Sequence, residues 1–408
     1  MTLATRPFGQ LFTFSRNSTK WEMGPDGKFI EYGVGEPAYR HDMATGKRLG
    51  ISINETVTTR NGSSLGSYGS PSSPNTSVEE VESIFEGKTA LKVTNLASGV
   101  AVGQAYGMGP LPGNGATAIL YVEITSTPSI MIRILDSDAS FLETAWVFSP
   151  ITEEMTFLSG SADNTVTDVV KLTNAGPNGG PVYRLRLTLT AQTNPGNNLT
   201  FSHYPAYEDD TFPDPRESII HYVGITDSRY PAPPIWVEGT PLTCSRDHVY
   251  IQPLAGTKEV PRTVYVEMVA DSAAIGAGND VHGGVGFVRL GGTASDRAWI
   301  GYRGVNATAP RIQVVTPGPS SNQLGATTVP NGELLKACLG WDSQNVAFCS
   351  NGDYYSQVTD AGVPEQNRQR LQIGHVITSG RVMNGLIKKI RVVNELWSQE
   401  RMEQETAA

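Results

Sequence analysis

The chain has 408 residues, of which 43 are glycine and 26 are proline, and its formal net charge is -9. Its length predicts two domains with smaller additions, and its many turn formers favour an all-β fold of short strands. The acidic balance argues against nucleic-acid binding through a general electrostatic field, and the lack of a long apolar run or secretion signal argues against membrane insertion and export by that route.

The first predicted unit is a small docking module over residues 1–60, built from tight hairpins. Residues 12–42 mix aromatic side chains with the turn formers Asp26-Gly27, Gly33 and Gly35, and they contain few long apolar runs. Such a segment has little core of its own, so we expect it to dock on the rest of the chain. Residues 61–78 (NGSSLGSYGSPSSPNTSV) are almost wholly small or turn-forming, and they predict a flexible linker.

A first antiparallel β-sandwich is predicted over residues 79–240. Segments 116–124, 130–135 and 183–190 alternate between apolar and other residues, with the period of two of a half-buried strand. In the last segment, YRLRLTLT, one face carries Tyr183, Leu185, Leu187 and Leu189, and the other carries Arg184, Arg186, Thr188 and Thr190. We expect the first face in the core and the second in contact with solvent or a ligand.

A second antiparallel β-sandwich is predicted over residues 241–408. Prolines concentrate between Asp209 and Pro241, and because proline cannot donate to a β ladder, these pieces are edges or connections between the domains. Strand patterns then resume at residues 263–270, 285–290, 298–303, 311–316, 333–342, 345–355 and 385–393.

One hairpin of the second sandwich can be put in register. A two-residue loop between Asp342 and Asn345 would set Leu339 opposite Phe348. The same loop would set Trp341 opposite Val346 on the same face, and Cys338 opposite Cys349 on the other. A longer loop with a slipped register stays open.

The pair Cys338 and Cys349 allows two interpretations. A cross-strand disulfide would form in an oxidising compartment. Three cysteines in a chain of this size are too few for a disulfide framework, so reduced thiols that pack as small side chains are favoured, with assembly in a reducing cytoplasm.

The end of the chain carries the one convincing helix pattern. Ser398 is placed to cap the segment SQERMEQET, and Glu400 lies in its first turn, near the positive end of the helix dipole. We expect this short helix to pack on the final sheet.

Catalytic and metal chemistry find little support in the sequence. Asp136, Asp138 and Ser140 alternate in LDSDAS, but an EF-hand needs Gly and Glu where this chain has Phe141 and Val147. A calcium loop of another kind stays open, although two aspartates in a turn are more often turn formers. No zinc spacing, nucleophile elbow or phosphate loop is found, and no catalytic carboxylate pair, metal ligand or cofactor can be named.

The order of segments resembles that of tailed-phage virion proteins. The opening segment is similar to an N-terminal module of these proteins, on Phe14, Arg16, Ser18, Asp26, Gly27, Glu36, Pro37, Tyr39, Arg40, Asp42, Thr45, Gly46, Leu49, Gly50, Ile53, Glu55 and Thr59. Residues 181–191 resemble a strand of their carbohydrate-binding-module-like jelly rolls. The segment from Ile219 to Asp247 resembles the connector C-terminal to these jelly rolls, and residues 380–406 resemble the closing strand and helix of concanavalin-like (laminin-G-like) domains.

This resemblance implies a tail-tip, fibre or spike subunit of the virion, without enzymatic activity, that binds other virion proteins and a host surface glycan. It implies a homo-oligomer, a trimer by analogy, assembled in the cytoplasm of the bacterial host. Aromatic rings that could stack on sugar are Trp299, Tyr302, Tyr354 and Tyr355. The alternatives are a decoration or adaptor protein without glycan affinity and, ranked last, a polysaccharide depolymerase.

Overall fold

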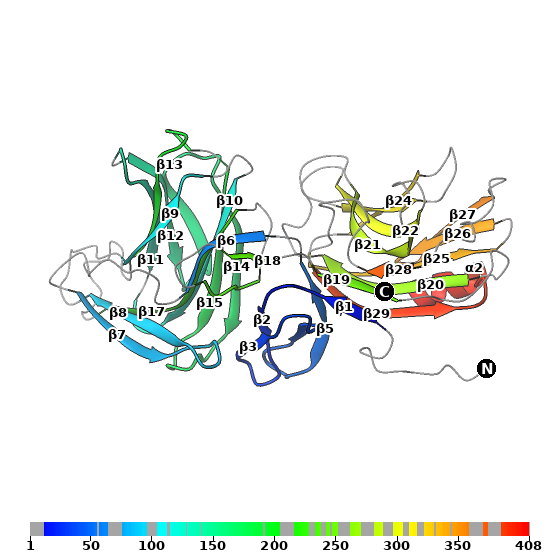
Figure 1. The fold of residues 1–408 in the computed structure, drawn as a ribbon, viewed down its shortest axis with the longest axis horizontal. Helices are drawn as coiled ribbons and strands as arrows, with labels where there is room; N and C mark the ends of the chain where they lie inside the picture. Colours follow the sequence, from blue (N-terminus) through cyan, green and yellow to red (C-terminus); the bar gives the residue numbers. More distant parts are fainter. Residues whose placement is uncertain are drawn as a thin grey trace.

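The computed structural model has an all-β fold that ends in a short helix (Figure 1). It describes residues 12–54, 57–63, 76–95, 104–111, 115–127, 129–139, 141–190, 192–204, 216–227, 233–237, 242–244, 247–251, 262–270, 281–288, 297–304, 310–315, 322–329, 332–342, 345–358, 370–373 and 385–407, some strands by their backbone alone. Within these residues, the strands of both β-sandwiches pair antiparallel, as the sequence predicts. No helix in this part of the chain has the length and apolar character needed to cross a membrane.

The first sandwich consists of two facing sheets. The larger sheet contains β6 (Val57–Ser63), β7 (Thr76–Glu82), β8 (Thr89–Asn95), β10 (Ala116–Ile124), β14 (Thr165–Thr173), β15 (Val182–Leu189), β17 (Arg216–Thr226) and β18 (Leu242–Cys244). The smaller sheet contains β9 (Gln104–Gly109), β11 (Ile130–Asp136), β12 (Phe141–Ser149), β13 (Glu154–Gly160) and β16 (Leu199–Tyr204). The core between them is aliphatic and aromatic.

The core face predicted for residues 183–190 is confirmed, whereas the other face is less exposed than expected, since Arg186 and Thr188 are also buried. Tyr183 and Leu185 lie in the core of the first sandwich, together with the next two leucines of that face. Arg184 and Arg186 therefore lie on the outer face of the larger sheet. The neighbouring β10 is buried on both faces, because the N-terminal segment covers its outer side and packs on Tyr121.

The second sandwich also has two facing sheets. One contains β1 (Thr13–Ser15), β19 (His248–Ile251), β21 (Val281–Val288), β22 (Arg297–Gly304), β23 (Pro310–Val315), β24 (Asn322–Thr328) and β28 (Arg370–Ile373). The other contains β4 (Tyr39–His41), β5 (Arg48–Ile53), β20 (Arg262–Ala270), β25 (Leu334–Trp341), β26 (Asn345–Ser350), β27 (Asp353–Val358) and β29 (Gly385–Val393).

The predicted register of the hairpin β25–β26 is confirmed. Leu339 pairs with Phe348 and Cys338 with Cys349. Both thiols are buried and free, and the Sγ of Cys349 lies 3.0 Å from the Oγ1 of Thr406. The two loop residues, 343 and 344, lie outside the described residues.

The terminal helix α2 (Gln399–Thr406) also begins as predicted. The side chain of Ser398 accepts a hydrogen bond from the backbone N–H of Arg401, and Glu400 lies in the first turn. Met402 and Thr406 are buried against the outer face of the sheet that contains β25 and β26.

The N-terminal segment contributes strands to the second sandwich. β1 pairs with β19, and β5 pairs with β29, so residues within the first 60 complete both sheets of that sandwich. The remaining hairpin, β2 (Lys20–Met23) with β3 (Phe29–Tyr32), lies between the sandwiches (Figure 1). The segment predicted as a docking module is thus built into the body of its own chain.

The ends of the predicted flexible linker lie in strands. Residues 61–63 belong to β6, which pairs with β17, and residues 76–78 belong to β7, which pairs with β8. Backbone hydrogen bonds hold these ends in strands although their side chains are small. The prediction of a linker considered only the side chains, so it missed this backbone pairing. Residues 64–75 lie outside the described residues.

Candidate functional site

The chain passes between the two sandwiches at two adjacent places. The first crossing comes after β5, and the second lies between β18 and β19. They are joined by two hydrogen bonds: Asn54 N–H donates to Asp247 Oδ2 over 2.9 Å, and Asp247 N–H donates to the Asn54 carbonyl over 3.1 Å. β6 and β18 pair beside them. The two sandwiches are therefore joined by two chain segments that are hydrogen-bonded to each other, rather than by one segment.

A buried ion network holds this joint. The carboxylate of Asp247 lies 3.1 Å from Arg16 Nη1 and 3.1 Å from Lys20 Nζ, and all three side chains are at most 2% exposed. Arg16 also donates to the carbonyls of Ser18 and Gly33, and Lys20 donates to that of Ser52. Burial lowers the pKa of Lys20, and the charge of Asp247 opposes that effect.

An aromatic cluster fixes the hairpin β2–β3 on the first sandwich. Phe29 stacks on Phe85 with ring centroids 4.6 Å apart, and Phe85 meets Tyr121 edge to face at 5.5 Å. Trp21 of the same hairpin contacts Trp236 from the proline-rich segment at 5.6 Å. These contacts set the distance between the hairpin and the outer face of β10 and β15.

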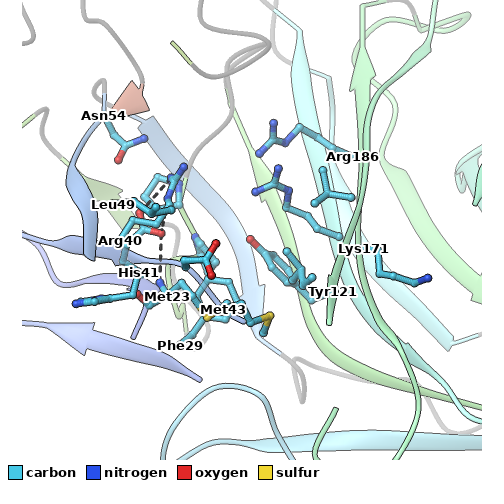
Figure 2. A pocket seen from close by; sticks show the side chains of 17 residues that line it. Met23, Phe29, Arg40, His41, Met43, Leu49, Asn54, Tyr121, Lys171 and Arg186 are labelled. Carbon is cyan, nitrogen blue, oxygen red and sulfur yellow. Dashed lines mark hydrogen bonds and ion pairs between the residues drawn. The ribbon is translucent and has the colours of Figure 1, made fainter. Parts of the chain in front are cut away.

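Beside this cluster, a cleft opens between the N-terminal segment and the first sandwich (Figure 2). Its volume is about 300 Å³, and it is lined by Glu22, Met23, Phe29, Arg40, His41, Asp42, Met43, Leu49, Asn54, Tyr121, Val170, Lys171, Leu172, Arg184, Arg186, Pro233 and Pro234. Arg186 and Tyr121 project from the sheet on one side, and Arg40 comes from the other (Figure 2). Both walls of the cleft contribute apolar side chains as well as charged groups.

The sheet wall of the cleft is basic. Asp168 Oδ2 accepts from Arg184 Nη2 over 2.5 Å and lies 3.2 Å from Arg186 Nη1. Both guanidinium groups thus meet at one carboxylate oxygen. Burial raises the pKa of Tyr121, and the two arginines oppose that rise, so the hydroxyl keeps its proton at neutral pH.

The opposite wall carries a bidentate ion pair. Arg40 Nε and Nη2 donate to the two carboxylate oxygens of Glu22 over 2.8 and 3.2 Å. Burial alone would raise the pKa of Glu22, but the Arg40 guanidinium and its hydrogen bonds lower it to about 2. Glu22 is therefore ionised at neutral pH and holds Arg40 at the cleft.

Two of the aromatic residues predicted to bind sugar, Tyr354 and Tyr355, lie on opposite sides of one strand. Tyr355 stacks on Phe348 and packs against the core of the second sandwich. Tyr354 packs on the opposite side of β27, against the cluster under α2. Trp299 and Tyr302 lie on β22, in the other sheet, and their side chains lie outside what is described. Sugar binding by these residues remains a prediction.

The aspartates considered as calcium ligands accept hydrogen bonds from their own turn and from nearby asparagines. Asp136 accepts from the side-chain amides of Asn194 and Asn197 and from two backbone N–H groups of its own turn. Asp138 accepts from Asn198. N–H donors thus point at these oxygens. Among the described residues, no group of three or more His, Cys, Asp or Glu side chains is arranged to hold a metal ion.

The candidate site could be found only in part from the sequence. The polar face of residues 183–190 points to Arg184 and Arg186, because a charged face opposite a core face must meet solvent or a ligand. Arg40 and Glu22 carry no such signal, because their pairing depends on how two short strands of the N-terminal segment fold against each other. Tyr121 is hidden in an apolar strand.

No protein-family model matches the sequence, and no curated protein matches it. Domain 4 of AbnA, a GH43 extracellular arabinanase from Geobacillus stearothermophilus solved in complex with arabinotriose, is similar with 13% identity and a TM-score of 0.30, over 40% of this chain and 73% of that one. Mouse laminin alpha1 chain domains LG4-5 are similar with 9% identity and a TM-score of 0.24, over 72% of this chain and 87% of that one. At such scores neither likeness carries an argument, and the fold class rests on the strand pairing of the two sandwiches.

Proposed function

We propose that the chain is a non-enzymatic subunit of a tailed-phage virion, in the tail tip, a fibre or a spike, that attaches the particle to a glycan on the host surface. Other virion proteins are its partners, and it forms a homo-oligomer, a trimer by analogy. It is assembled in the cytoplasm of the bacterial host.

One observation supports this proposal most strongly. Arg16 belongs to the segment that resembles the N-terminal phage module, and Asp247 ends the segment that resembles the connector of the same proteins. These residues are 231 positions apart in the chain and form one buried ion pair. The resemblance thus falls on residues that hold one joint together, and this supports the proposal.

The position in the particle can be tested directly. Antibodies against the full chain should label the tail end of purified particles in electron micrographs. Labelling of the head surface alone would favour the decoration or adaptor alternative. Particles that lack the chain would contradict the proposal.

Glycan attachment has to be tested on the intact protein. Because β1, β4 and β5 complete the sheets of the second sandwich, a fragment that starts after residue 240 would lack three strands. The full chain on an array of bacterial surface glycans should bind a defined subset, and heat-unfolded chain should bind none. The adaptor alternative predicts no binding, and a depolymerase would release reducing ends from the polysaccharide.

A further inference from the structure

Arginines, a tyrosine and apolar side chains line the cleft between the N-terminal segment and the first sandwich. We propose that it holds an acidic sugar, a uronic acid residue of a polysaccharide, whose carboxylate contacts Arg184 and Arg186 and whose ring lies against the apolar residues of the lining. This inference rests on the proposed glycan-binding function and names the class of glycan.

The first argument is the pair of arginines on the sheet wall. Arg184 and Arg186 lie two residues apart on β15, so both guanidinium groups project from the same face towards the cleft. The carboxylate of Asp168 bridges them and holds them at a fixed separation. A guanidinium group is a planar fork of donors that matches a carboxylate, and preorganised groups lose less entropy on binding.

The second argument is the donor beside them. Tyr121 is 3% exposed, and its ring is held at the edge of Phe29 at 5.3 Å and of Phe85 at 5.5 Å. The hydroxyl faces the cleft in Figure 2. Because the hydroxyl stays protonated, it can donate to a carboxylate or ring oxygen. A donor beside two cations is suited to an anionic oxygen-rich ligand.

The third argument is shape. The volume of about 300 Å³ lies at the lower end of the range for small-molecule sites, which suits one sugar ring rather than a long chain. Met43, Leu172 and Pro234 offer an apolar surface for the C–H face of a pyranose. The Arg184 and Arg40 side chains are each 23% exposed, so the cleft is open to solvent beside them and a polysaccharide can continue out of it, whereas the Arg186 side chain is 5% exposed.

The test compares an acidic and a neutral ligand on the full chain. Trigalacturonate and the neutral trigalactose of the same linkage are titrated by calorimetry into the natural chain. Into each variant, Arg186→Gln, Arg184→Gln and Tyr121→Phe, the acidic ligand is titrated. Arg401→Gln is the matched control, since this guanidinium lies on α2 in an exposed ion pair with Glu395. Thermal unfolding of every variant shows whether it is folded.

We expect trigalacturonate to bind at least about tenfold more tightly than its neutral counterpart, because charge-assisted hydrogen bonds are worth a factor of this size or more. Arg186→Gln and Arg184→Gln should each weaken binding about tenfold or more, and Tyr121→Phe should weaken it several-fold without loss of folding. Arg401→Gln should bind as the natural chain does.

The outcomes separate this inference from the function on which it rests. Equal binding of both trisaccharides, or full binding by folded Arg186→Gln and Tyr121→Phe variants, overturns the acidic-sugar site. If the array shows a neutral glycan whose binding these variants leave unchanged, glycan attachment stands and the cleft is not its site. If no glycan binds the full chain, both proposals fail.

Discussion

Replacement of Asp247 by Asn removes the negative charge that two buried cations share. Arg16 and Lys20 would then stay buried, each about 3 Å from a neutral amide, since both now lie 3.1 Å from a carboxylate oxygen. Removal of one partner of a buried ion pair costs about 3–5 kcal/mol, because the remaining charge is uncompensated. That is a large fraction of the roughly 5–15 kcal/mol that stabilises a typical domain.

Chemical denaturation of the full chain, monitored by tryptophan fluorescence, measures the effect. Glu82→Gln is the matched control, because its ion pair with Lys28 is exposed, with side chains 59% and 40% accessible, and such pairs contribute about 0–1 kcal/mol. Hydrogen exchange at β1 and β19 would locate the loss at the joint. If Asp247→Asn unfolds at the same denaturant concentration as Glu82→Gln, the joint does not depend on this network.

Three further predictions concern stability. The pKa of Glu22 is lowered from 4.5 to about 2, which corresponds to about 3 kcal/mol of the free energy of unfolding. This stabilisation is complete above pH 4.5 and is lost as the pH falls towards 2, so acid unfolding of Glu22→Gln should lack this pH dependence. Gly46→Ala should lower the melting temperature more than Gly35→Ala. Both glycines have positive φ, but only at Gly46 would a Cβ meet a backbone oxygen, at 2.5 Å. An equal fall in melting temperature for both variants would contradict this. Phe348→Ala should cost about 3–5 kcal/mol by denaturation and Leu334→Ala, at an exposed position, under about 1 kcal/mol, whereas a similar cost for both would argue against the described core.

Local patterns in the sequence determined the parts of the structure that depend on near neighbours. The alternation of Tyr183 and Leu185 with two arginines predicted which face of β15 is buried, because a strand turns successive side chains to opposite sides. The register of Cys338 with Cys349 could be derived from a short loop, and the start of α2 from Ser398. In each case the interacting residues are close in the chain.

Only the tertiary structure decided how the N-terminal segment is used. Its strands complete sheets whose other members begin some 200 residues later, and the carboxylate that neutralises Arg16 and Lys20 lies at Asp247. The cleft likewise exists because the hairpin β2–β3 docks opposite Arg184 and Arg186. Such contacts depend on the path of the whole chain and on which sheet edges remain to be paired. The local periodicity and spacing of residues predict neither the path nor the free edges.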